Sequence, residues 1–171
     1  AHPATVRAEA LRQTARILDV RGHLEEALRT IQAALDALSS RKDHPALAAR
    51  TLGDLGWLIY RQGRLEEAEA HYLEALGLHL EEDSIRAQVH SLYGVLRYAR
   101  AELDESVVQH EKALRIRRRL GDSQGVAKCF NNLALVAERR GDLEAATQWH
   151  AKSVRSKAAS GDRPGLALAY N

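Results

Sequence analysis

The chain has 171 residues, and its 25 Lys and Arg side chains nearly balance 23 Asp and Glu, which leaves a formal net charge of +2. This balance does not favour binding to nucleic acid or to an anionic membrane, and no apolar run approaches the ~20 residues that a membrane-spanning helix needs. The single cysteine, Cys129, excludes an intramolecular disulfide and a thiolate metal cluster. Its apolar neighbours favour a buried position, and the absence of a signal-peptide pattern favours a cytoplasmic location.

Glycine, aspartate and proline divide the chain into eight predicted helices and part of a ninth. The predicted helices cover residues 3–21, 23–40, 45–62, 64–81, 84–100, 102–120, 123–140 and 142–160. Glycines stand where a left-handed residue ends a helix: Gly22, Gly63, Gly121, Gly141 and Gly161. Aspartates follow three of them in the N-cap position: Asp122, Asp142 and Asp162. Because no stretch of alternating β-branched residues competes with these helices, the sequence predicts an all-α fold.

One short pattern, Arg-Gly-His-Leu-Glu-Glu-Ala at 21–27, recurs with variations at 62–68, 100–106 and 140–146. Its leucines are Leu24, Leu65, Leu103 and Leu143, so successive copies are 41, 38 and 40 residues apart. A repeat of this length without linkers predicts a solenoid, because each unit must stack on its neighbours to bury its apolar face. We expect one array over residues 1–171, with repeats at about 3–40, 45–81, 84–120 and 123–160.

The last residues repeat an earlier segment. Residues 121–131 align with residues 161–171 at an offset of 40. The chain therefore stops within the first helix of a fifth repeat, at 162–171. Natural solenoids end in a helix with a polar outer face, so we expect the sequence to be a fragment of a longer protein, with self-association possible through this end.

Small and large residues alternate in the repeats. The small residues Ala15, Gly56, Gly94 and Ala134 share one position, and the larger residues Ile31, Tyr72, His110 and His150 share another. Together with Leu55-Gly56, Gly63, Ala68, Tyr72 and Ala75, this alternation resembles the tetratricopeptide repeat. The resemblance covers nearly the whole chain and is to the long variety of about 40 residues, found in Pins/LGN-type adaptors and many bacterial regulators. Repeat three departs from the pattern at Ala101, which replaces the turn glycine, and at Arg97, so we expect looseness or a contact site there.

The resemblance implies a right-handed superhelix of antiparallel helix pairs, in which the first helix of each pair lines an inner groove. Helical spacing places nine candidate partner-binding residues on that wall: Arg12, Arg16, Arg50, Trp57, Tyr60, Gln88, Tyr98, Lys128 and Asn131. Arg and aromatic side chains dominate the energetics of protein interfaces. The alternative is that Trp57 and the tyrosines only fill space between repeats.

Some family members hold a ligand's terminal carboxylate with Lys and Asn on this wall. Lys128, Asn131 and Asn171 fit that arrangement. Gly53 and Ser91 stand where repeats two and three would need matching amides, which argues against a complete clamp.

Other chemistry is weakly indicated. His71 and His79 are two helical turns apart, too far for one metal ion, and His110 and His150 occupy equivalent packing positions. The basic run 115–119 ends a predicted helix, where cations complement the helix dipole, so we interpret it as a solvated terminus rather than a nucleic-acid site. Phosphate loops, nucleophile elbows and paired carboxylates are absent from the sequence. We expect no catalytic residue, no metal and no cofactor.

The sequence thus favours a non-catalytic scaffold that binds a peptide or protein segment in its groove. Its Ala-, Arg- and Leu-rich composition favours a bacterial, cytoplasmic protein. An alternative is the ligand- or peptide-sensing domain of a signalling ATPase or transcription regulator. An enclosed pocket with convergent polar groups would favour the sensor, and an open trough the scaffold. A third possibility is a spacer or self-association segment.

Overall fold

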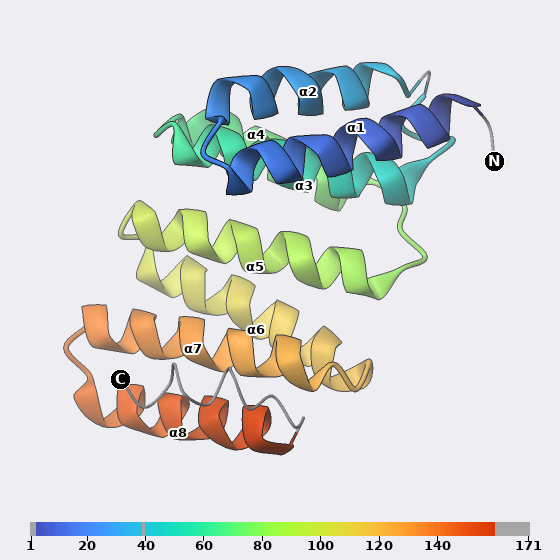
Figure 1. Cartoon of the computed structure of the whole chain (residues 1–171). Helices are drawn as coiled ribbons and strands as arrows, with labels where there is room; N and C mark the ends of the chain where they lie inside the picture. The colour runs from blue at the N-terminus through green and yellow to red at the C-terminus, as the bar shows by residue number, and fades with distance from the viewer. Residues whose placement is uncertain (1–2, 39, 160–171) are drawn as a thin grey trace. The chain divides into compact units, whose positions relative to one another are not determined.

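The computed structural model describes residues 3–38 and 40–159, and this part of the chain consists of eight α-helices without a strand (Figure 1). The helices are α1 (Pro3–Val20), α2 (Leu24–Asp36), α3 (Pro45–Arg61), α4 (Leu65–Gly77), α5 (Asp83–Ala99), α6 (Leu103–Arg119), α7 (Ser123–Arg139) and α8 (Leu143–Ala159). The prediction of an all-α fold with eight helices here is confirmed. The predicted ninth helix, 162–171, lies outside the described residues, as do Gly161, Asp162 and Asn171.

The helices group into two compact units, residues 1–92 and 93–171, with the boundary inside α5. In the first unit α1 packs against α2, α3 against α4, and α1 and α2 also contact α3. In the second unit α7 packs against both α6 and α8. Cys129 is buried there with Ala113, Leu114, Phe130 and Leu133. No helix in the described part of the chain has the length and apolar character needed to cross a membrane.

Two helices end four residues earlier than the sequence predicts. The prediction ran to residue 40 for the second helix and to residue 81 for the fourth, whereas α2 ends at Asp36 and α4 at Gly77. After Gly77 the chain turns into an extended conformation at Leu78, with φ −73° and ψ 145°. Leu38 and Leu78 remain in contact with one apolar cluster of the first unit. The leucines that made these segments look helical therefore serve packing after the helix has ended.

The turn between paired helices requires a left-handed residue. Gly22, Gly63, Gly121 and Gly141 have φ values between 67° and 82°, as predicted. Ala101 occupies the same position in repeat three and has φ 61°. Its turn keeps the usual hydrogen bonds, with the Ala101 N–H donating to the Tyr98 carbonyl at 3.0 Å. A Cβ in this region of φ/ψ space clashes with its own backbone, so Ala101 is strained.

We expect Ala101→Gly to raise the free energy of unfolding by about 1 kcal/mol, because glycine removes that clash. Chemical denaturation of the variant measures the change. Ala70→Gly is the matched control in the middle of α4 and should lower stability by about 1 kcal/mol, the helix-propensity cost of glycine. If Ala101→Gly lowered the free energy of unfolding, the backbone of Ala101 would not be strained.

The aspartates after two of the turn glycines act as N-caps, as predicted. The Asp122 carboxylate accepts a hydrogen bond from the Gly125 N–H at 2.8 Å, and the Asp142 carboxylate accepts one from the Ala145 N–H at 2.9 Å. Each satisfies an amide that has no partner within its helix.

The small residues predicted from the alternation permit close helix pairing. A Cβ on Gly56 would lie 2.7 Å from the Tyr72 ring, and one on Gly94 would lie 2.6 Å from the His110 ring. Tyr72 and His110 are both buried. Burial lowers the pKa of His110 to about 4, so this ring is neutral at pH 7 and serves packing. In repeats two and three, therefore, a glycine at one position leaves room for a large ring at the facing position.

Candidate functional site

A cleft of about 520 Å³ lies between α1 and α3 in the first unit. Its volume is within the range of known ligand-binding pockets, about 300–1,000 Å³. The C-terminal half of α1 forms one wall, α3 forms the other and Ile31 of α2 contributes as well. The lining residues are Gln13, Ala15, Arg16, Ile17, Asp19, Val20, Arg21, Ile31, Asp54, Trp57 and Leu58.

The cleft has an accessible apolar wall. Trp57 is half-buried and stacks on Tyr60, with ring centroids 5.4 Å apart and an interplanar angle of 27°. On the opposite helix, Ile17 is 53% exposed and Val20 is 88% exposed. Apolar side chains gathered at a concave surface are a feature of interaction sites, since burying them against a partner is favourable.

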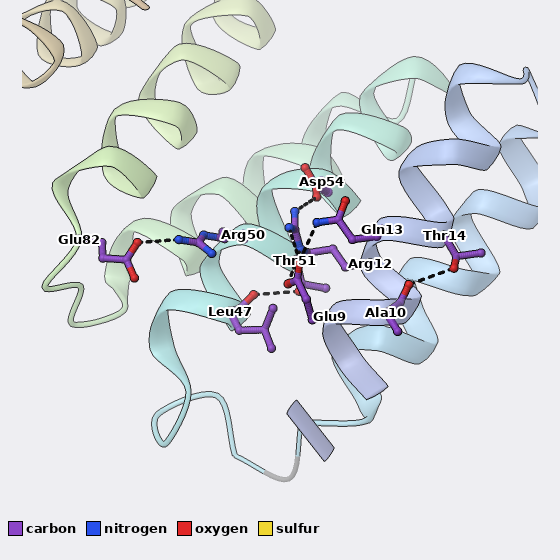
Figure 2. Close-up of polar contacts among 10 residues, drawn as sticks. All are labelled: Glu9, Ala10, Arg12, Gln13, Thr14, Leu47, Arg50, Thr51, Asp54 and Glu82. Atoms are coloured by element: carbon purple, nitrogen blue, oxygen red, sulfur yellow. Dashed lines mark hydrogen bonds and ion pairs between the residues drawn. The ribbon is translucent and has the colours of Figure 1, made fainter. Parts of the chain in front are cut away.

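A partly buried ion-pair network lies beside the cleft and joins its two walls. The Arg12 guanidinium donates from Nη1 to Asp54 Oδ2 at 2.7 Å and from Nη2 to Glu9 Oε1 at 2.8 Å (Figure 2). Gln13 Nε2 also donates to Glu9 Oε1, at 2.6 Å. Since Arg12 is on α1 and Asp54 on α3, the pair fixes the two helices of the cleft relative to each other.

The charges of this network depend on one another. Burial raises the pKa of Asp54, and the guanidinium of Arg12 opposes that rise. Glu9 lies nearer the solvent, and its hydrogen bond with Arg12 holds its pKa below the usual value. Arg12 thus favours the ionised form of two neighbouring carboxylates, one of them at the cleft.

Arg16 and Asp19 supply the polar groups at the open side of the cleft. Arg16 is exposed and forms no ion pair with any described residue. Asp19 pairs with Arg61 of α3. Arg16 is therefore a cation available to a partner beside the apolar wall.

The structure brings some of the predicted groove residues of the first unit together. Arg16 and Trp57 line the cleft, and Tyr60 adjoins it through its stack with Trp57. Arg12 is only 6% exposed and is held in the network. Arg50 pairs with Glu82 at 2.6 Å (Figure 2). Gln88 is exposed on α5 and does not line the cleft.

The remaining predicted residues lie in the second unit. Tyr98 is half-buried, and the Arg139 guanidinium lies 4.7 Å from the centroid of its ring. Arg139 also donates a hydrogen bond to the Tyr98 carbonyl. Lys128 is exposed and Asn131 is half-buried, both on α7.

Sequence reasoning missed Asp54, Gln13, Ile17 and Val20. Asp54 is the only charged residue between 51 and 60, a segment that is otherwise mostly apolar. A charge in such surroundings needs a partner when it is buried, and this signal was available. Helical spacing could not show that the partner of Asp54 is Arg12 rather than Arg50, which lies one helical turn away.

A metal centre has no basis in the described residues, since no group of three His, Cys, Asp or Glu side chains there is arranged to hold an ion.

Two sequence models of the tetratricopeptide repeat match the chain, one over residues 48–81 and the other over residues 85–159. No curated protein sequence matches it. Among solved structures, BtubC (BKLC) from P. vanneervenii is 26% identical over 90% of this chain, with a TM-score of 0.77. This chain spans 64% of the length of BtubC.

Two structures of lower sequence identity share the fold alone. MamA is 15% identical over 91% of this chain, which spans 81% of MamA, with a TM-score of 0.67. Aspartyl phosphate phosphatase F from Bacillus subtilis is 9% identical over 99% of this chain, with a TM-score of 0.87. This chain spans 45% of that phosphatase.

Proposed function

Because the chain belongs to the tetratricopeptide repeat family, we propose that it is a non-catalytic scaffold that binds a segment of another protein along the first helices of its repeats. Helical repeats of this kind present extended surfaces to their partners. The proposed binding function requires neither a metal ion nor a cofactor.

The cleft between α1 and α3 carries the proposal. Its apolar wall accepts an apolar or aromatic side chain of the partner against Trp57, between Ile17 and Val20. Arg16 then lies beside that side chain and binds a carboxylate of the same segment. An aromatic anchor in a pocket with an Arg at its edge has the composition of an interface hot spot.

Arg12 acts indirectly in this proposal. Its guanidinium is already bonded to Glu9 and Asp54, so it shapes the cleft rather than touching the partner. Tyr60 supports Trp57 through the stack. The other predicted partner-binding residues stay predictions, each for the first helix of its own repeat: Arg50, Gln88, Tyr98, Lys128 and Asn131.

We expect Trp57→Ala to weaken peptide binding by about 2 kcal/mol, roughly 30-fold, because hot-spot aromatics lose energy on this scale. Peptides selected from a displayed random library against the full chain serve as probes, and calorimetry gives their affinities. The same variant should keep its unfolding midpoint close to that of the wild type, since the indole is only half-buried.

Leu73→Ala is the matched control, because Leu73 is 50% exposed on α4 and does not line the cleft. It should leave peptide affinity unchanged. If Trp57→Ala kept full affinity, or if its lost binding followed a collapse in stability, the cleft would not be the binding site.

A second function, sensing of a small ligand, is favoured by one observation. Polar groups of Gln13, Arg16 and Asp54 converge on the cleft, and its volume suits a small molecule as well as a side chain. Selected peptides separate the two functions. Tight peptide binding supports the scaffold, whereas failure of all peptides together with thermal stabilisation by small amphiphilic molecules supports the sensor.

A further inference from the structure

The second unit carries a basic surface that the proposed cleft does not use. Residues 111–119 of α6 contain five basic side chains and one acidic one, and residues 149–159 of α8 contain three basic side chains and none that is acidic. Lys112 and Lys152 stand at equivalent places in their repeats, as do Arg115 and Arg155, each pair 40 residues apart. Two neighbouring second helices therefore repeat the same pattern of positive charge.

Hydrogen bonds bring the C-terminal ends of α6 and α8 to the same part of α7. Arg117 Nη1 on α6 donates to the Gly125 carbonyl at 3.0 Å. From α8, Ser153 Oγ donates to the Ala127 carbonyl at 2.9 Å and Ser156 Oγ to the Ser123 carbonyl at 3.0 Å. Since all three acceptors lie in the first turns of α7, the basic ends of α6 and α8 flank a single short stretch of that helix.

Aromatic rings connect the two basic helices and hold their cations. The Arg118 guanidinium of α6 lies 5.4 Å from the centroid of the Phe130 ring of α7. Phe130 stacks on Trp149 of α8 with centroids 5.6 Å apart, and Lys152 Nζ lies 3.9 Å from the Trp149 centroid. The result is a ladder of cation, ring, ring and cation across three helices. Cations held in this way need less ordering when an anion binds.

Arg117 of α6 pairs with Asp122, whereas Arg115, Arg118, Lys152 and Arg155 form no ion pair with the described residues. In the first unit, Arg12, Arg50 and Arg61 each pair with a carboxylate. In the described part of α6, α7 and α8, Arg118 and Lys152 contact rings, and Arg155 donates to a backbone carbonyl. The exposed Glu111, one helical turn before Arg115, is the acidic residue of 111–119. The dipole of a helix explains why cations lie at the end of that helix. It does not explain why cations and rings from three helices contact one another.

We propose that the basic face formed by Arg115, Arg118, Lys152 and Arg155 is a second binding surface, which takes an acidic segment of a partner protein. Carboxylates complement the outward edges of these guanidinium and ammonium groups. The proposal does not depend on the cleft, which lies in the other unit.

An acidic protein segment fits this face better than nucleic acid does. Protein surfaces that bind single strands use aromatic faces as stacking platforms, and here the rings of Phe130 and Trp149 stack on each other and carry cations. The excess of positive charge is also confined to the second unit. Residues 93–171 have a net charge of +5, whereas residues 1–92 have 11 basic and 14 acidic side chains, a net charge of −3. A short acidic segment confined to the second unit would meet a surface with this net positive charge.

Fluorescence anisotropy with a labelled glutamate-rich peptide tests the proposal on the full chain. The peptide should bind, and binding should weaken as salt is raised. Reversing two charges, Arg115→Glu with Arg155→Glu, should weaken it by about ten-fold or more, because two attractions become repulsions. Arg29→Glu with Lys42→Glu changes the net charge equally on exposed residues of the first unit and should leave the affinity nearly unchanged.

The two tryptophans give a local readout. In a Trp57→Phe background Trp149 is the only tryptophan, and its emission should change on peptide binding because a carboxylate bound to Lys152 alters the electrostatic environment of the indole. Equal losses in the two double variants, no change of Trp149 emission, or tighter binding of DNA than of a peptide of equal charge would each overturn the proposal.

Discussion

Replacing Arg12 by methionine is expected to lower the free energy of unfolding by about 3 kcal/mol, the scale found when one partner of a buried ion pair is removed. The substitution leaves the Asp54 carboxylate at the α1–α3 contact without its guanidinium. Methionine retains much of the apolar stem, so lost packing contributes little. Urea denaturation of the two proteins at neutral pH measures the difference.

The pH dependence of this loss follows from Asp54. Burial already raises its pKa in the folded chain, and removal of Arg12 should raise it further. The folded variant then takes up a proton more readily than the unfolded chain. Its deficit should therefore be largest at neutral pH and shrink as the pH falls through the raised pKa.

Two further variants isolate the buried charge. Asp54→Asn in the Arg12→Met background should recover part of the stability, because a neutral amide is cheaper to bury than a carboxylate. Arg16→Met, an exposed arginine on the same helix, should change stability by less than about 0.5 kcal/mol. A loss that is independent of pH and not relieved by Asp54→Asn would show that the ion pair does not hold α1 to α3.

A second large effect is expected at Gly56. Gly56→Leu should destabilise the chain by about 3 kcal/mol through overpacking, because even a Cβ there lies 2.7 Å from the Tyr72 ring. Gly77→Ala is the control, since a Cβ at Gly77 meets no atom within 4 Å. Thermal and urea unfolding measure both.

The cause of the Gly56 effect can be tested by compensation. Gly56→Ala combined with Tyr72→Ile recreates the Ala15 and Ile31 combination that repeat one uses at the equivalent, buried positions. We expect the double variant to be more stable than Gly56→Ala alone. If the two substitutions were simply additive, the ring of Tyr72 would not be the group that excludes a side chain at Gly56.

Much of the fold was predictable because it follows from local rules. Gly63 and Asp122 occupy positions that only certain residues fill well, so the turn and the cap were visible from residue type. Pairs such as Gly56 with Tyr72 follow from the repeat itself. The ends of α2 and α4 were less predictable, because Leu38 and Leu78 continue the apolar pattern beyond the helix and pack from irregular backbone.

The candidate site was predictable only in part. Helical spacing gave the face of α1 and α3 that carries Arg16 and Trp57, and these two do line one cleft. It did not give the distances between helices, so Arg12 seemed as available as Arg16. Arg12 in fact reaches Asp54, 42 residues away, and is buried. Which residue on a polar face is committed to internal pairs depends on tertiary contacts that spacing alone does not contain.

Nuclear magnetic resonance of the two indole N–H groups tests the central claim, that a protein segment binds in the cleft beside Trp57. The chain contains two tryptophans, Trp57 and Trp149, so its ¹H–¹⁵N spectrum should show one indole signal from each unit. Adding a library-selected peptide should shift the Trp57 indole and the backbone amides of 13–20 and leave the Trp149 indole in place. A peptide that binds while the Trp57 indole and those amides stay unchanged would contradict the account.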